Sequence, residues 1–360
     1  MKITDRYITK TLFNYTIIVL IVWVSIYSFF NFLSELNSVG KNGYSILSAF
    51  TYIILQLPEV AYKQASPIIL LGCILGMGHL ASTGQLLIFR VSGASILRIT
   101  MQTIKNSIIF IIFFISMGEF LAPISSNYAQ ISKATAMGKS IVSQSQNGFW
   151  IRDGVNFINV KNNVDGSLFS GITVIEVNSA NMIERVIKSE KALFDGSSLN
   201  MNGAKIFSID DSSFFDEVSL KERNSYNKIV SFDQDLVKSL EKEPEALSTW
   251  TLFKQIRFLS DNKLRAGVFE VELYNRLIQP VTLIAMVLIA MLFIFGSTRS
   301  VTLGRKIFFG VVLALSFEMF SRVANAMALS FDFSPLLSSI VPSILIMFIA
   351  STLLIQKSYR

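Results

Sequence analysis

Runs of apolar residues near both ends of the chain predict membrane-spanning helices. Five of these runs are about 20 residues long, enough to cross the ~30 Å hydrocarbon core of a bilayer: Thr11–Leu33, Ile104–Leu121, Leu277–Gly296, Ile307–Leu329 and Pro335–Ile355. A further apolar region, Ser45–Ala81, would measure about 54 Å as one helix. Pro58 and Pro67 lie inside it, and a proline can kink or divide a helix. The pattern therefore predicts either six or seven spans.

Short segments, several with apolar residues at alternate positions, fill the region from Ser143 to about Ser239. They read 149-FWIR-152, 155-VNFINV-160, 172-ITVIEV-177, 183-IERVIKSEKALF-194 and 204-AKIFSI-209. Around them stand pairs that favour tight hairpin turns: Asn147-Gly148, Asp153-Gly154, Asp165-Gly166, Asp195-Gly196 and Asn202-Gly203. We expect an antiparallel sandwich or jelly roll, whose interior is either an ordinary core or a groove open to an apolar ligand. Predicted helices at Ser125–Ser140 and Leu247–Tyr274 connect this domain to the spans.

Basic residues decide between six and seven spans. Eleven cations, accompanied by the acid Asp5, flank the apolar runs on one side: Lys2, Arg6, Lys10, Arg90, Arg98, Lys105, Arg299, Arg305, Lys306, Lys357 and Arg360. The short connections on the other side carry only Lys41 as a cation. Because short basic loops stay in the cytoplasm, both termini are predicted to be cytoplasmic and the number of spans even. We therefore expect six spans, with Ser45–Ala81 as one long kinked helix that rises above the bilayer.

The predicted fold is an α-helical membrane protein with six transmembrane helices and an all-β domain inserted between the third and fourth. Residues 1–124 hold spans one to three, with a cytoplasmic helix at about 82–95. Residues 125–274 form the external jelly-roll-like domain with helical connectors, and residues 275–360 hold spans four to six. The formal charge of +7 then reflects this topology and not an affinity for nucleic acid.

The sequence offers little catalytic chemistry. One cysteine, Cys73, and one histidine, His79, exclude most nucleophilic and metal chemistries. In 133-KATAMGKS-140, Lys133 stands where a phosphate-binding loop needs its first glycine, and no strand precedes the segment. We therefore expect no enzyme activity, no metal site and no cofactor in this chain.

Opposite charges four residues apart occur twice at membrane depth. Glu59 precedes Lys63, and Glu318 precedes Arg322. This spacing puts each pair on one helical face. Charges within a membrane need a partner or a polar cavity, so each pair either neutralises itself or lets its cation meet an anionic head group.

The stretch 82-STGQLLIFRVSGAS-95 is too polar to span a membrane and too apolar for a free loop. On the predicted topology it lies in the cytoplasm. Two interpretations are open. It forms an amphipathic helix on the inner leaflet, or it docks into an apolar groove of a partner protein.

The chain resembles the LptF/LptG permease family of the lipopolysaccharide exporter. The resemblance covers nearly the whole chain and is clearest in 5-DRYITK-10, 84-GQLLIFRVSGAS-95, 118-GEFLAP-123, 148-GFWIRDGVNFINV-160, Leu273–Pro280 and 293-FIFGSTRSVTLGRKIFFG-310. The phenylalanine-glycine and arginine-serine pieces of the last stretch favour the LptG branch. The β region aligns less tightly.

The resemblance implies a function and a set of partners. Such a chain would be a permease subunit in the inner membrane of a Gram-negative bacterium, with its β domain in the periplasm. It would pair with an LptF-like permease, two LptB-like ATPases that bind ATP and Mg²⁺, and an LptC-like bridge protein. Together they would extract lipopolysaccharide from the outer leaflet and pass it toward the outer membrane. A non-transporting scaffold or sensor is the alternative function.

The resemblance also implies roles for particular residues. The residues expected to couple to the ATPase are Gln85, Leu86, Leu87, Phe89 and Arg90. Those expected to line a lipid cavity are Trp23, Tyr27, Phe30, Leu33, Phe317, Phe320 and Val323, although ordinary helix packing explains any one of them equally well. The candidates for contacting head-group phosphates are Lys41, Lys63 and Arg322.

The chain departs from the family pattern at three of its polar positions. Gln85 stands where a glutamate is usual, and Asn31 and Glu59 replace basic residues. A charge-assisted contact is roughly twice as strong as a neutral one. We therefore expect the ATPase contact at Gln85 to be weaker or differently matched, and the head-group contacts to be rearranged.

Overall fold

A computed structural model describes residues 3–41, 43–137, 149–164, 167–178, 182–210, 217–230, 232, 244–262, 264–295, 303–331 and 333–359. The chain separates into two compact units. One unit combines Met1–Lys133 with Glu270–Arg360, and the other is Ala134–Phe269.

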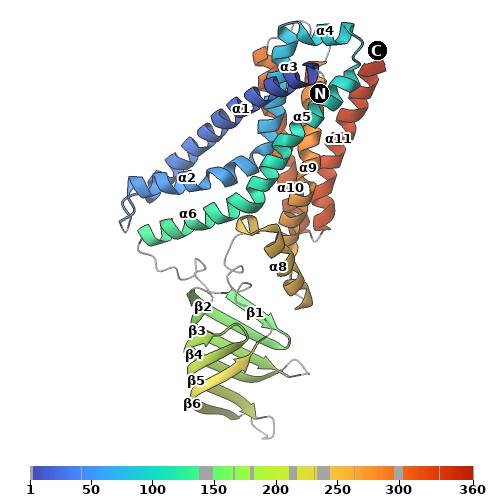
Figure 1. The fold of residues 1–360 in the computed structure, drawn as a ribbon. Helices are drawn as coiled ribbons and strands as arrows, with labels where there is room; N and C mark the ends of the chain where they lie inside the picture. The colour runs from blue at the N-terminus through green and yellow to red at the C-terminus, as the bar shows by residue number, and fades with distance from the viewer. Residues whose placement is uncertain are drawn as a thin grey trace. The chain divides into compact units, whose positions relative to one another are not determined.

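The first unit is helical, and its chain contributes to six helices long and apolar enough to cross a membrane. The spans are formed by α1 (Ile3–Glu35), α3 (Ala65–Ser82), α5 (Ile96–Ser116) with its continuation, α9 (Gly267–Ile294), α10 (Leu303–Ser330) and α11 (Pro335–Tyr359). The prediction of six spans is therefore confirmed. The first residues of α1 and the last of α11 lie at the same end of the unit, beside α4 (Gln85–Val91) (Figure 1).

The long apolar region after the first span divides at one residue. Gln64 separates α2 (Ile46–Lys63) from α3, and its backbone leaves the helical region at ψ 16°. The break lies between Pro58 and Pro67, where the sequence predicted a kink. Only α3 is apolar and long enough to be a span, so the prediction of one long kinked helix over Ser45–Ala81 is wrong, and the region contributes one span and one separate helix.

The helix α3 is the centre of the helical unit. It packs against both α1 and α10, and the approach is close because glycines lie at the contacts. A Cβ added at Gly72 would stand 2.6 Å from Thr16 Oγ1 in α1, and one at Gly310 of α10 would stand 2.7 Å from Ile74 Cδ1 in α3. Small residues allow helices to approach in this way within membranes.

The third span continues without interruption into a connector. α5 runs into a π-helical turn, Met117–Leu121, and then into α6 (Ala122–Ala136). This agrees with the helix predicted at Ser125–Ser140, whose last three residues lie outside the described part of the chain. A Cβ at Gly118, inside the π-helical turn, would stand 2.2 Å from the Tyr62 ring. Glycine at this position therefore allows the turn to pack against the end of α2.

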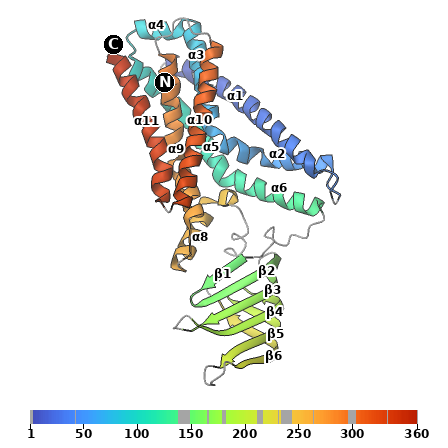
Figure 2. The ribbon, with the colours of Figure 1, turned by 180° about the vertical axis from the view of Figure 1, so that it is seen from behind.

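The second unit contains a six-stranded antiparallel sheet with the order β1-β2-β3-β4-β5-β6. The strands are β1 (Phe149–Asp153), β2 (Asn156–Val164), β3 (Leu168–Val177), β4 (Ile183–Phe194), β5 (Ser198–Asp210) and β6 (Glu217–Ile229). The expected antiparallel β domain between the third and fourth spans is confirmed. Its described strands form a meander, in which every strand pairs with its sequence neighbours (Figure 2).

One face of the sheet forms a closed core. Side chains such as Ile158, Val174 and Leu199 are fully buried, and Phe169 stacks on Phe194 with ring centroids 5.7 Å apart. Within the described residues, this favours an ordinary core over a groove open to an apolar ligand. The hairpin turn predicted at Asn202-Gly203 is wrong, because both residues lie inside β5, where Gly203 adopts φ +64°. Glycine tolerates this conformation within a strand.

Two further elements lead from the sheet back to the membrane. A short helix, Pro244–Ala246, precedes α8 (Thr249–Asp261), and α9 begins six residues after α8 ends, at Gly267. The single helical connector predicted over Leu247–Tyr274 is thus wrong, because the range holds two helices, α8 and the start of α9. Asn262 caps the end of α8, where its backbone N–H and its side-chain amide both donate to the Phe258 carbonyl.

Candidate functional site

The helix α1 presents a long apolar side that nothing in the unit covers. Only 11% of its most apolar stretch is buried, against 72% for α3. The exposed apolar residues of α1 between positions 18 and 33 are Ile18, Ile21, Val22, Ile26, Tyr27, Phe29, Phe30 and Leu33. Both helices are apolar and long enough to cross a membrane, so the difference in burial reflects packing within the unit.

The helix α10 has the same character. Again 11% of its most apolar stretch is buried, and its exposed residues include Phe308, Phe309, Val312, Leu315, Met319, Phe320, Val323 and Met327. Both α1 and α10 are held by α3. They contact different faces of it, since Gly72 and Gly76 meet α1, whereas Leu71 and Ile74 meet α10. The unit therefore offers two uncovered apolar walls supported by one buried helix.

The seven residues expected to line a lipid cavity divide into two groups. Tyr27, Phe30, Leu33, Phe320 and Val323 are exposed on these two walls, with Phe30 the most exposed at 65%. Trp23 and Phe317 instead pack against the helical core. Trp23 also donates a hydrogen bond from Nε1 to Gln64 Oε1 over 3.1 Å, which ties α1 to the break between α2 and α3.

Two of the three expected phosphate-binding cations lie beside acids. Lys63 Nζ stands 2.7 Å from Glu59 Oε1, and an Arg322 nitrogen stands 2.6 Å from Glu318 Oε1. The Arg322 side chain nevertheless remains 68% exposed, so one side of its guanidinium is open. Lys41 is exposed in the turn that follows the short helix Leu36–Ser38.

A charged contact at the far end of α1 was missed by the sequence reasoning. Lys133 in α6 lies 2.8 Å from the Glu35 carboxylate in α1, and its Nζ also stands 4.6 Å above the Tyr52 ring of α2. Buried Tyr44 lies beside this pair, and burial together with the Glu35 carboxylate raises the pKa of its phenol. No local pattern could reveal the contact, because 98 residues separate Glu35 from Lys133.

The predicted cytoplasmic helix exists as α4, with glycines in the left-handed region at both ends. Gly84 precedes it at φ 77° and Gly93 follows it at φ 90°. Leu86 is buried and Phe89 packs against the helical core, whereas Leu87, Ile88 and Val91 are exposed at 60%, 66% and 81%. Arg90 is exposed beside them. The outward apolar surface of α4 therefore consists of Leu87, Ile88 and Val91, of which only Leu87 was singled out from the sequence.

Gln85 makes a contact inside its own chain. Its side-chain nitrogen donates to the Tyr7 hydroxyl of α1 over 3.1 Å. The first helix thus contacts the start of α4 directly. A shift of α4 would therefore displace or break this hydrogen bond at the N-terminal end of α1.

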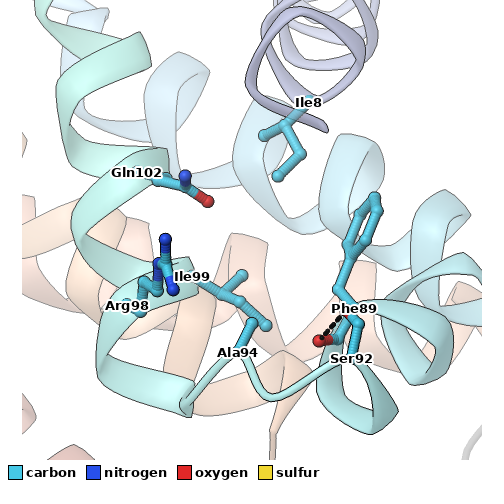
Figure 3. Close-up of a pocket in the computed structure, with 7 residues that line it drawn as sticks. All are labelled: Ile8, Phe89, Ser92, Ala94, Arg98, Ile99 and Gln102. Carbon is cyan, nitrogen blue, oxygen red and sulfur yellow. Dashed lines mark hydrogen bonds between the residues drawn. The ribbon is translucent and has the colours of Figure 1, made fainter. Parts of the chain in front are cut away.

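A pocket of about 190 Å³ lies where α1, α4 and α5 meet (Figure 3). Its lining comes from all three helices and from the turn between α4 and α5: Ile8, Phe89, Ser92, Ala94, Arg98, Ile99 and Gln102. Phe89 and Ile8 point into it from two different helices. The pocket leaves space beside Phe89, so α4 is incompletely packed on that side.

Chemical groups for catalysis do not gather in the described part of the chain. Among those residues, no group of three histidine, cysteine or acidic side chains could hold a metal ion. Cys73 is buried in α3 and lies 3.6 Å from the Ser107 hydroxyl of α5. Among the described residues, the candidates for function are therefore the exposed apolar surfaces of α1, α10 and α4.

Comparison with known proteins identifies the family of the chain that carries these surfaces. Residues 6–356 match the family described as lipopolysaccharide export system permease LptF/LptG. The chain is 25% identical over 361 residues to the lipopolysaccharide export system permease protein LptG of Escherichia coli strain K12, with 99% of each chain covered. It is also 25% identical over 357 residues to the LptG protein of Haemophilus influenzae, with 98% of each covered. These relatives agree with the branch that the sequence favoured.

The match spans all six candidate spans, α4 and the β sheet. The fold expected from the resemblance is thus present in the described part of the chain. The chain belongs to the lipopolysaccharide export system permease LptF/LptG family.

Proposed function

We propose that this chain is one of two permease subunits that extract lipopolysaccharide from the outer leaflet of the inner membrane. The observation that carries the proposal is the pair of uncovered apolar walls on α1 and α10, in a chain of this family. Lipopolysaccharide carries several acyl chains below a phosphorylated head group. It therefore needs a broad apolar wall within the membrane and cations near the outer interface. The flexible side chain of Met319 can adapt its shape to acyl chains, and Phe30 and Phe320 offer them large apolar surfaces.

The cations supply the second requirement. Arg322 can accept a phosphate on its open side while Glu318 holds its position, which is the planar recognition that guanidinium groups favour. Lys41 and Lys63 are the other candidates. Arg322 lies on α10 itself, and Lys63 ends α2 beside Gln64, which Trp23 of α1 contacts, so head group and acyl chains would be held close together.

Energy would enter through α4. Leu87, Ile88 and Val91 form an apolar surface suited to the groove of an LptB-like ATPase, with Arg90 at its rim. Leu86 and Phe89 hold α4 to the spans, and Gln85 holds it to α1. In this proposal ATP and Mg²⁺ bind to two copies of the ATPase, and this chain provides no catalytic group. An LptF-like permease completes the cavity, and an LptC-like protein receives the lipid.

The proposal places both termini and α4 in the cytoplasm and the sheet in the periplasm. It is supported by the eleven cations near the termini and the short loops on that side. The position of α4 beside the ends of α1 and α11 is consistent with this orientation.

Photo-crosslinking in cells tests the lipid wall. A photoreactive residue replaces Phe320 in α10, which is 52% exposed, and Phe348 in α11, which is 68% exposed, is the matched control. We expect a lipopolysaccharide adduct at position 320 that depends on ATPase activity, and at least tenfold less at 348. Equal capture at both positions, or capture at neither while the protein supports growth, would contradict the cavity and favour a scaffold or sensor.

Co-purification with the ATPase tests α4 separately. Leu87→Asp places a charge on the outward side of the helix, whereas Leu47→Asp changes a leucine of α2 that is also exposed. We expect at least a tenfold loss of bound ATPase for Leu87→Asp and none for Leu47→Asp. Phe89→Asp is the poorer test, because Phe89 packs against the spans and the change would disturb the chain itself. Normal ATPase binding by Leu87→Asp would refute docking through this surface.

A further inference from the structure

The connector helix α8 carries four large or charged residues on one side. Trp250, Phe253, Lys254 and Arg257 follow the spacing i, i+3, i+4 and i+7, which places them within an arc of about 100°. Trp250 is 66% and Phe253 is 53% exposed, and both cations are exposed. The opposite side carries Leu252, Gln255 and Leu259, which are buried. We call the four exposed residues the aromatic–cationic stripe.

The stripe is ordered within itself. The Trp250 and Phe253 rings stack with centroids 6.3 Å apart and planes 17° apart. The Lys254 ammonium lies 6.0 Å from the centroid of the Trp250 ring, within range of a cation–π contact. Two exposed aromatic rings side by side form an apolar patch, and such patches mark interaction sites. The two cations beside the rings favour a negatively charged partner at this site.

The covalent chain keeps the stripe near a membrane. Leu264 donates a backbone hydrogen bond to the Leu259 carbonyl over 2.8 Å, so the chain turns back tightly at the end of α8. The span α9 begins at Gly267. Six residues extend by at most ~20 Å, so the end of α8 lies within that distance of the first residue of α9.

We infer that the aromatic–cationic stripe binds the anionic head-group layer of the bilayer that α9 enters. Tryptophan and phenylalanine settle at the boundary between head groups and acyl chains, while lysine and arginine reach lipid phosphates. Charge complementarity favours an anionic surface, and a phospholipid bilayer fits better than an acidic protein because it offers acyl chains to the two stacked rings and phosphates to Lys254 and Arg257 beside them. The stripe would anchor the return path from the sheet to the fourth span. This role does not depend on which lipid the protein transports.

Spin labelling of the full-length chain in lipid nanodiscs tests the inference. The native cysteine, Cys73, is buried in α3 and is replaced by serine, so that single cysteines can be labelled. The label is placed at Phe253 of α8, with Phe348 of α11 as the membrane reference and Glu222 of β6 as the water reference. In nanodiscs containing phosphatidylglycerol, collisions with oxygen report membrane exposure, and collisions with a nickel chelate report water exposure.

We expect the oxygen-to-nickel collision ratio at position 253 to be at least fivefold above that at position 222 and closer to that at position 348. A ratio equal to that at 222 would show a solvated stripe and overturn the inference. Low collision rates with both reagents would show that a protein surface covers the stripe, which would also overturn it.

A charge variant tests the part played by the cations. Lys254→Gln with Arg257→Gln should lower the ratio at position 253 at least twofold in phosphatidylglycerol nanodiscs and leave it unchanged in phosphatidylcholine. The matched variant, Lys221→Gln with Arg223→Gln on the exposed strand β6, removes the same charge and should change neither value. An unchanged ratio for the α8 variant in both lipids would refute recognition of anionic head groups.

Discussion

The helices α1 and α3 are both apolar spans, yet they occupy opposite environments. α3 is surrounded by the other helices, and residues such as Ile68, Leu70 and Met77 have no exposed surface. α1 contacts α3 through one side and leaves most of its apolar residues uncovered. The comparison shows that one buried helix can support two walls, α1 and α10, whose free sides remain available for lipid or a partner permease.

The largest difference should appear when one methionine is truncated in each environment. Met77→Ala in α3 empties a fully buried site, and Met319→Ala in α10 changes a residue that is 62% exposed. We expect Met77→Ala to lower the free energy of unfolding by about 2–5 kcal/mol and Met319→Ala by less than ~0.5 kcal/mol. Unfolding in mixed micelles measures both. Equal losses would show that the two helices are packed alike.

The next largest effect is expected at the contact between Gly72 of α3 and Thr16 of α1. In Gly72→Val the new Cβ would meet both Oγ1 and the backbone of Thr16, at 2.6 Å and 2.9 Å. We expect the two helices to be forced apart at a cost of about 1–3 kcal/mol, measured as a lower unfolding temperature. Gly304→Val in α10 serves as the control, since a Cβ there has nothing within 4 Å. Comparable effects at Gly72 and Gly304 would contradict a tight contact between α1 and α3.

A smaller effect is expected where α1 is tied to α6. The Glu35–Lys133 pair is largely shielded, with side chains 11% and 27% exposed, whereas the Lys205–Glu222 pair of the sheet is 59% and 67% exposed. A double-mutant cycle with Glu35→Gln and Lys133→Met should give a coupling of about 1–2 kcal/mol, and Lys205→Met with Glu222→Gln almost none. Coupling of similar size in both pairs would mean that burial does not strengthen the contact.

The smallest effect concerns the hydrogen bond from Trp23 to Gln64. Trp23→Phe keeps an aromatic ring against the helical core and removes only the donor. We expect a loss of about 0.5–1 kcal/mol, together with faster hydrogen exchange around the break at residue 64. Trp150→Phe, at an exposed position of β1, should leave exchange in α2 and α3 unchanged. Unaltered exchange near Gln64 in Trp23→Phe would show that the hydrogen bond does not hold the break.

Strands with one buried face could be predicted, and the edge strand β6 could not. β3 to β5 alternate over much of their length between buried and more exposed residues, which produces the pattern recognised in the sequence. β6 lies at the edge, and its residues from Ser219 to Ser225 are all exposed, so its sequence shows no alternation. Charged residues such as Lys221 and Glu222 protect such an edge from pairing with other chains.

The sequence predicted which helices form the candidate site, but it did not predict which of their residues are exposed there. Sequence and resemblance pointed to the first and fifth spans and to the segment at 82–95. Only side-chain packing separated exposed Phe320 from core-packed Phe317, or exposed Leu87 from buried Leu86. Residues of the same type can lie close together in a helix and still face different directions. Consecutive residues point about 100° apart, and residues three apart differ by about 60°.

By itself the sequence determined the number of spans, the place of the inserted sheet and the short polar–apolar helix between spans two and three. These follow from hydropathy, charge and turn residues, which act locally. The tertiary structure alone decided that α3 is buried while α1 and α10 are uncovered. The physical reason is that lipid tails and a protein core are both apolar, so a membrane helix shows the same hydropathy in either place. What distinguishes them is contact, such as the approach of Gly72 to Thr16, and contact is a property of the folded chain.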